Sequence, residues 1–130
     1  MTKPAIYGAV ALPFALLDFI WLTLMGDRLY RPVLGDMMRI NVWPAVLFYL
    51  VYPIGVVMFA VLPAKDPGSA RAPMLGMMFG FFTYATYDLT NQATLQNWST
   101  LLTSVDVVWG SALAGTCAYL GYLIAVKLDA

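Results

Sequence analysis

Residues 73–95 read PMLGMMFGFFTYATYDLTNQATL, an apolar stretch that carries an aspartate and an asparagine near its end. It is long enough to cross a hydrocarbon core of about 30 Å, which takes roughly 20 helical residues. Positions three and four apart share one face of a helix. One stripe therefore collects Gly76, Gly80, Tyr84, Tyr87, Asp88, Asn91 and Leu95. Because an aspartate at the centre of a lipid-facing helix costs about 2.5 to 3.5 kcal/mol, the stripe is expected to face other helices.

The composition places the whole chain in the membrane. Of its 130 residues 62% are apolar and 11% are charged, and the mean hydropathy of +0.76 lies outside the range of soluble domains. The formal net charge is zero, so nothing indicates nucleic-acid binding. One cysteine and no histidine leave no internal disulfide and no CxxC or histidine metal site, and we predict no metal site. No cofactor is indicated by these residues.

Four apolar stretches are long enough to span a bilayer, and turn or helix-breaking residues separate them. The approximate spans are 5–25, 44–62, 73–95 and 102–126. They predict an all-α fold, a single transmembrane domain over 1–130 built as an integral membrane four-helix bundle with both termini on the same side. The glycines at 76 and 80 form a GxxxG motif, which lets a neighbouring backbone approach closely.

The charges between the spans bear on orientation. The terminal side would carry the basic residues Lys3, Lys65, Arg71 and Lys127. The opposite side would carry only the three arginines of the first loop. The excess of one basic residue favours termini in the cytoplasm.

Two further spans each carry an aspartate followed by a tryptophan three positions later, DFIW at 18–21 and DVVW at 106–109. A rise of about 1.5 Å per residue puts Asp18 and Asp88 roughly 20 Å from the cytoplasmic ends of their helices. Asp106 enters from the other side and lies about four residues in. All three aspartates therefore fall in one layer, about 6 to 10 Å below the non-cytoplasmic surface. The second span brings Tyr49 and Tyr52 to the same level.

This layer is the candidate site. The candidates for ligand binding or proton acceptance are Asp18, Asp88, Asn91 and Asp106, and the candidates for pocket walls are Trp21, Tyr49, Tyr52, Tyr84, Tyr87 and Trp109. Buried carboxyl groups need compensation, which could come from protonation, from Tyr and Trp hydrogen bonds, from a bound cation, or from loop arginines. Those arginines, as salt-bridge partners, are Arg28, Arg31 and Arg39. Trp43 and Trp98, at span ends, are expected to be interfacial anchors.

Four segments together resemble a known family. They are D-x-x-W-L in the first span, PAVLFYLVYP in the second, YDLTNQATL with its following tryptophan in the third, and D-x-x-W-G in the fourth. The chain resembles small bacterial membrane proteins catalogued as domain of unknown function 2177. The resemblance implies a four-helix protein of the bacterial inner (cytoplasmic) membrane and implies no particular activity. The matching signature positions are Asp18, Trp21, Tyr87, Asp88, Asn91, Asp106 and Trp109.

Three hypotheses for function follow. The first is a protein that binds or translocates a small cation, a proton or an amphipathic molecule at the aspartate layer, with a homodimer completing the pathway. The second is a membrane enzyme on a lipid or apolar substrate, with aspartates as general acid and base, although the chain lacks histidine. The third is a structural or assembly subunit, in which the polar layer fixes helix register. Binding is preferred because ionisable residues inside a membrane are costly and are usually kept for function.

Overall fold

The computed structural model describes residues 2–64, 66 and 70–129, and within them all regular structure is helical. Four long helices form the framework: α1 (Thr2–Met25), α3 (Val42–Val56), α4 (Arg71–Thr94) and α5 (Thr100–Asp129). Shorter turns extend them: the π-helical η1 (Gly26–Tyr30) and η3 (Val57–Val61), the short α2 (Arg31–Leu34), and the 3-10 turns η2 (Gly35–Met37) and η4 (Leu62–Ala64). The predicted all-α bundle is confirmed.

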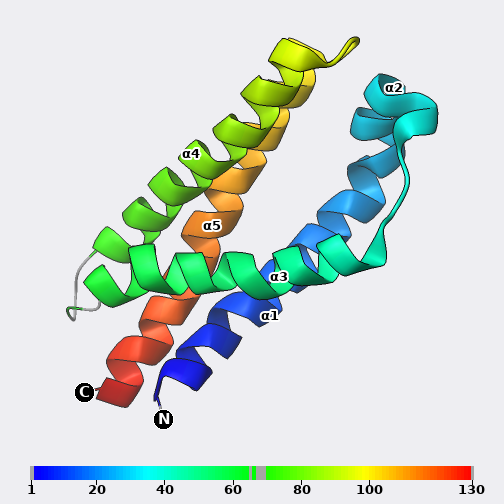
Figure 1. Cartoon of the computed structure of the whole chain (residues 1–130). Coiled ribbons are helices and arrows are strands. Elements are labelled where there is room, and N and C mark those ends of the chain that lie inside the picture. Colours follow the sequence, from blue (N-terminus) through cyan, green and yellow to red (C-terminus); the bar gives the residue numbers. More distant parts are fainter. Residues whose placement is uncertain (1, 65, 67–69, 130) are drawn as a thin grey trace.

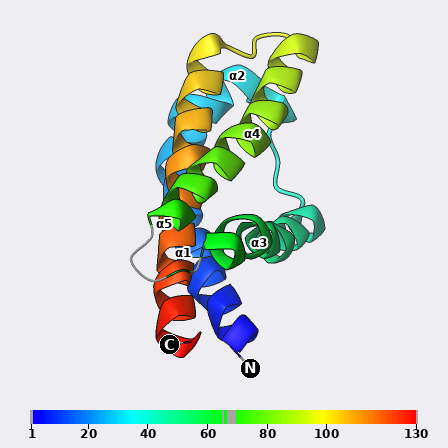
Figure 2. The same ribbon diagram turned by 90° about the vertical axis from the view of Figure 1, so that its left-hand side faces the viewer.

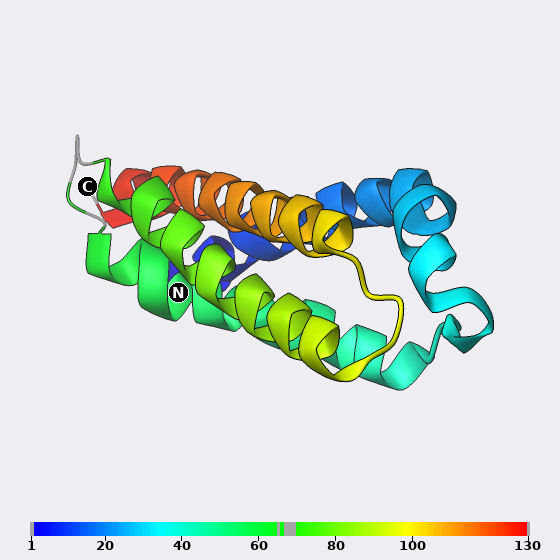
Figure 3. The same ribbon diagram turned by 90° about the horizontal axis from the view of Figure 1, so that it is seen from above.

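The helix α5 is the centre of the bundle. It packs antiparallel to α4 along one side and to α1 along another, whereas α3 crosses the others obliquely (Figures 1 and 2). The start of α1 and the end of α5 lie at one end of the bundle, and the connection from η1 to α3 lies at the opposite end (Figure 3). The start of α1 and the end of α5 are therefore at the same end of the bundle, and the side of the membrane on which they lie stays a prediction.

Three helical segments in the described chain are long and apolar enough to cross a membrane, Thr2–Met37, Val42–Ala64 and Thr100–Leu128. The fourth predicted span, α4, has 24 residues but a more polar composition, because its second half carries four threonines together with Asp88 and Asn91. Helix α4 packs against α5, and Asp88 of the polar half is buried in the bundle, as its helical stripe predicts. Thr86, Thr90 and Thr94 are exposed, so only part of the polarity of α4 is directed inward.

Close packing of α4 on α5 depends on glycine. A Cβ atom added at Gly76 would lie 2.6 Å from the carbonyl oxygen of Ala114, and one added at Gly80 would overlap the carbonyl oxygen of Gly110. No side chain fits at either position unless the backbones separate. The packing role predicted for the GxxxG motif is confirmed.

The apolar core lies in the half of the bundle that holds the chain ends. Its largest fully buried side chains include Phe14 of α1, Val56 of α3 and Leu113 of α5. Within α3, Pro53 has no backbone N–H to donate, and the helix widens into the π-helical η3 one turn later. A second, smaller cluster around Tyr30, Trp98 and Leu102 closes the other half. The polar layer lies between these two apolar clusters.

Candidate functional site

All three predicted aspartates are buried, each on a different helix: Asp18 on α1, Asp88 on α4 and Asp106 on α5. The aspartates of the first loop, Asp27 and Asp36, are exposed. Burial alone therefore separates the three carboxyl groups of the candidate site from those of the loop. Their surroundings differ, and the difference distinguishes their roles.

Asp18 is fully paired. One carboxyl oxygen accepts a hydrogen bond from the hydroxyl group of Tyr49, and the other accepts one from the indole N–H of Trp109 at 3.1 Å. These donors come from α3 and α5, so a single carboxyl group joins three helices. Hydrogen bonds to an ionised group are about twice as strong as neutral ones. Asp18 therefore has the partners that a structural residue needs.

Asp106 is held from the loop end of the bundle. It accepts a hydrogen bond from the hydroxyl group of Tyr30, and that hydroxyl accepts one from the indole N–H of Trp21 at 2.9 Å. Tyr30 is buried although the next residue, Arg31, is exposed, because the π-helical turn η1 directs the tyrosine into the bundle. Asp106 thus reaches α1 through a tyrosine outside the predicted spans.

The two D-x-x-W motifs exchange partners. The aspartate of the α1 motif binds the tryptophan of the α5 motif directly, and the aspartate of the α5 motif is joined to Trp21 of the α1 motif through Tyr30. The indole rings of Trp21 and Trp109 stack with centroids 4.5 Å apart and planes inclined by 7°. We call Asp18, Trp21, Tyr30, Asp106 and Trp109 the Asp–Trp clasp. The two copies of the motif thus join the antiparallel helices α1 and α5.

Asp88 is the exception. Its side chain is 0% exposed, and neither carboxyl oxygen has a hydrogen-bond partner among the described residues. The neighbouring side chain that acts on its carboxyl group is the carboxyl group of Asp106. A buried polar group without a partner costs about 1 to 3 kcal/mol, and more when it is charged. An ionised Asp88 would therefore lower the stability of the fold, because the neighbouring carboxyl group of Asp106 can form a hydrogen bond with it only when one of the two carries a proton.

The tyrosines predicted as walls lie around this layer in different ways. The hydroxyl groups of Tyr52 and Thr83 are hydrogen-bonded at 2.9 Å, and the ring of Tyr52 meets that of Tyr84 edge-on with centroids 6.2 Å apart. The ring of Tyr84 fills the space over Gly110, where a Cβ atom would overlap it. Tyr87 is half exposed and packs edge-on against Trp98 at 5.8 Å.

Near the end of α4 the Asn91 side chain is partly buried and makes no hydrogen bond within the described chain, so its role as a ligand-binding candidate stays a prediction. Its neighbour Gln92 is hydrogen-bonded to Thr100 at 3.0 Å and to Thr103 at 2.7 Å. Trp98 is buried and donates to Thr103 at 3.0 Å, so it is a core residue and no interfacial anchor. Trp43 is 77% exposed, as an anchor would be.

The proposed arginine compensation is also absent from the described residues. Arg31 pairs with Asp27, one helical turn before it, at 2.6 Å, and both side chains are exposed. Arg28 and Arg39 are exposed, and neither forms an ion pair with a buried aspartate in the parts of the chain described. Tyrosine and tryptophan side chains, and not the loop arginines, donate hydrogen bonds to Asp18 and Asp106.

Metal binding finds no support in the described residues, because no group of three or more His, Cys, Asp or Glu side chains there is placed to hold a metal ion. The residues that sequence reasoning missed are Tyr30, Thr83, Gln92 and Thr103. A weak signal existed for Thr83, which lies one turn before the polar residue Tyr87 on α4.

Comparison with known proteins adds one finding. The model of a family described as predicted membrane protein (DUF2177) matches residues 4–123. No curated protein matches the chain, and no solved structure does.

Proposed function

The chain belongs to the DUF2177 family of predicted membrane proteins, and we propose that it takes up and releases a proton at the carboxyl pair Asp88–Asp106. The observation that carries the proposal is the isolation of Asp88, which is fully buried with two unpartnered oxygens beside a second carboxyl group. We place the protein in a bacterial inner membrane with cytoplasmic termini, following its charge distribution.

A proton fits this pair better than other compensating groups. Two neighbouring carboxyl groups can share one proton, as a carboxylic acid on one residue donates to the carboxylate of the other. The shared proton would give Asp88 the hydrogen bond that it lacks. A metal ion would need more ligands than the pair supplies, and no third such side chain of the described chain completes a site.

Tyr30 supports an exchange route toward the loop end of the bundle. Its hydroxyl group donates to Asp106 and accepts from Trp21, so it can both receive and give a proton. Arg31, which follows Tyr30 in sequence, is exposed, whereas Leu29, which precedes it, is partly buried. Exchange from this end requires one copy of the chain, whereas transfer across the membrane would require a continuous polar path, for which we propose a homodimer.

The test is the pH dependence of stability. Thermal unfolding of the purified full chain in detergent would be followed by circular dichroism between pH 5 and pH 9. If the folded pair holds a proton that the unfolded chain releases, unfolding temperature falls as pH rises. Asp88→Asn should remove this slope, while Asp36→Asn, which changes an exposed loop carboxyl group, should keep it. A slope that survives in Asp88→Asn contradicts the proposal. Loss of folding in both Asp88→Asn and Asp88→Ala would favour the structural-subunit hypothesis.

A further inference from the structure

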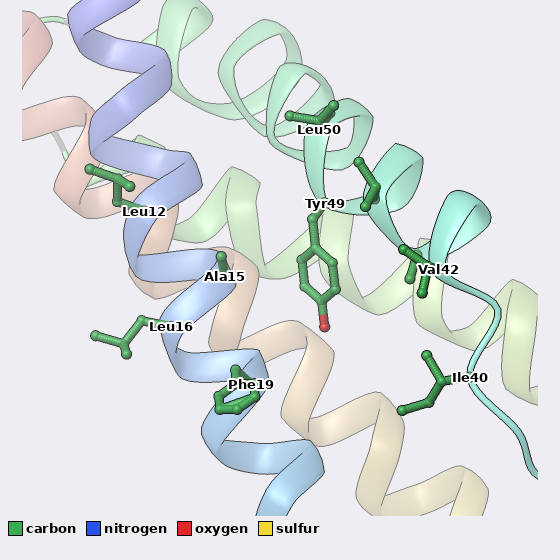
Figure 4. A pocket seen from close by; sticks show the side chains of 10 residues that line it. Leu12, Ala15, Leu16, Phe19, Ile40, Val42, Tyr49 and Leu50 are labelled. Atoms are coloured by element: carbon green, nitrogen blue, oxygen red, sulfur yellow. The ribbon is translucent and has the colours of Figure 1, made fainter.

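A groove on the lipid-facing side of the protein lies apart from the Asp88–Asp106 pair. It is bounded by α1 and by α3 with its preceding loop, and its volume is about 690 Å³. Sites for small molecules usually measure about 300 to 1,000 Å³. Figure 4 shows Leu12, Leu16 and Phe19 on the α1 side and Ile40 and Val42 on the other. The groove exists because α3 crosses α1 obliquely, so the two helices diverge on one side of the crossing (Figure 1).

The chemistry of the groove suits a hydrocarbon chain. Nine of its ten lining residues are Leu, Ala, Phe, Ile or Val. The tenth, Tyr49, points into the space between the helices (Figure 4), and its hydroxyl group is already donated to Asp18. No free hydrogen-bonding group is therefore offered to an occupant. The α1 wall extends over about 10 Å between Leu12 and Phe19, at 1.5 Å per residue.

Residues next to the loop end of the groove are charged or amphipathic, in contrast to its apolar walls. Ile40 is preceded by the exposed Arg39, and Val42 is followed by the exposed Trp43. Exposed tryptophans mark the headgroup level of a bilayer. Arg39 and Arg28 form no ion pair within the described chain, whereas Arg31 is engaged by Asp27. The loop beside the apolar groove carries three arginines and the two aspartates Asp27 and Asp36, so one positive charge is in excess there, at the level of lipid headgroups.

From this combination we propose that the groove binds one anionic phospholipid, with an acyl chain between α1 and α3 and its phosphate at Arg39. The bilayer is the source of this ligand, because the groove faces the hydrocarbon that surrounds the protein. In this proposal the charge of Arg39 selects an anionic headgroup, and the apolar walls of the groove hold the acyl chain. Two different substitutions should therefore affect two different properties.

The probe is phosphatidylglycerol, compared with phosphatidylcholine, added to the purified full chain in detergent, with retained lipids counted by native mass spectrometry. Wild type should retain phosphatidylglycerol in preference. Arg39→Gln should reduce that preference about fivefold, because one arginine near an anionic lipid is worth about 1 kcal/mol. Ala15→Trp, which fills the groove, should abolish retention of both lipids, and Val46→Trp should do the same from the opposite wall.

The matched control is Ala112→Trp, which puts the same side chain on an exposed position of α5 outside the groove and should leave retention unchanged. Equal retention of the two lipids by wild type would overturn the proposal, as would wild-type retention in the folded groove-filling variants. A dimer that Ala15→Trp dissociates would assign the groove to a second copy instead. None of these outcomes depends on Asp88, so failure here is distinct from failure of the proton site.

Discussion

The contrast between Asp88 and Asp18 gives the sharpest prediction, because the same substitution, aspartate to asparagine, should have opposite effects. At position 88 the amide is isosteric, needs no charge and can donate to Asp106, a hydrogen bond worth about 0.5 to 1.5 kcal/mol. The variant Asp88→Asn should match wild type at pH 5 and be more stable at pH 9. At position 18 the side chain is surrounded by two donors. An asparagine there turns an NH₂ group toward one donor and loses a charged hydrogen bond, at a cost of about 1.5 to 3 kcal/mol.

The chain supplies its own reporter for this measurement. Cys117 is the single cysteine of the sequence, and it is fully buried. A fluorogenic maleimide should therefore react only when the bundle opens, and thermal ramps at one fixed pH give directly comparable midpoints. At pH 7 the two asparagine variants should differ by roughly 1.5 to 4.5 kcal/mol, which is the loss at position 18 plus the part of the gain at position 88 that is present at this pH. Equal destabilisation by both variants would refute the reasoning, since Asp88 would then have partners as strong as those of Asp18.

Further predictions concern packing and the clasp. Gly80→Ala should cost about 1 to 3 kcal/mol by overpacking α4 against α5, whereas Gly8→Ala, where an added Cβ meets nothing within 4 Å, should be neutral or stabilising; the same thiol assay compares them. Trp109→Phe keeps an aromatic stack but removes a hydrogen bond to a carboxyl group, so it should lose about 1.5 to 3 kcal/mol. Trp21→Phe loses a bond to a hydroxyl group and should lose about 0.5 to 1.5 kcal/mol; the reverse order would contradict the clasp. Arg31→Gln breaks an exposed pair and should change the unfolding midpoint little, within about 1 kcal/mol; a larger loss would show that the loop is held by this pair.

Much of the architecture could be predicted because membrane helices obey simple rules of length and period. Apolar length gave the helices, and the GxxxG spacing gave the contact of α4 with α5. Depth counting brought the three aspartates to one layer, where the structure places Asp88 beside Asp106 and joins Asp18 to α5 through Trp109.

The partners in that layer could not be predicted in the same way. Tyr30 follows an arginine-containing turn and looks like a loop residue, and only the π-helical geometry of η1 turns it inward. Arg31 seemed available to a buried carboxyl group, yet Asp27 lies one turn away on the same helical surface and needs no desolvation. The reciprocal pairing of the two D-x-x-W motifs depends on how the antiparallel helices α1 and α5 are aligned. The spacing of residues within one motif carries no information on that alignment.

The clasp also sets an order of assembly during synthesis. The indole that completes the partners of Asp18 is 91 residues further along the chain, so at 5 to 20 residues per second it is made about 5 to 20 s later. Throughout that interval Asp18 has at most one of its two hydrogen-bond donors, the hydroxyl group of Tyr49. Asp106 does not wait for its partner, because Tyr30 has already been synthesised when Asp106 is added to the chain. The last helix therefore completes the insertion of the first, and a chain truncated before α5 should leave α1 loosely held in the bilayer.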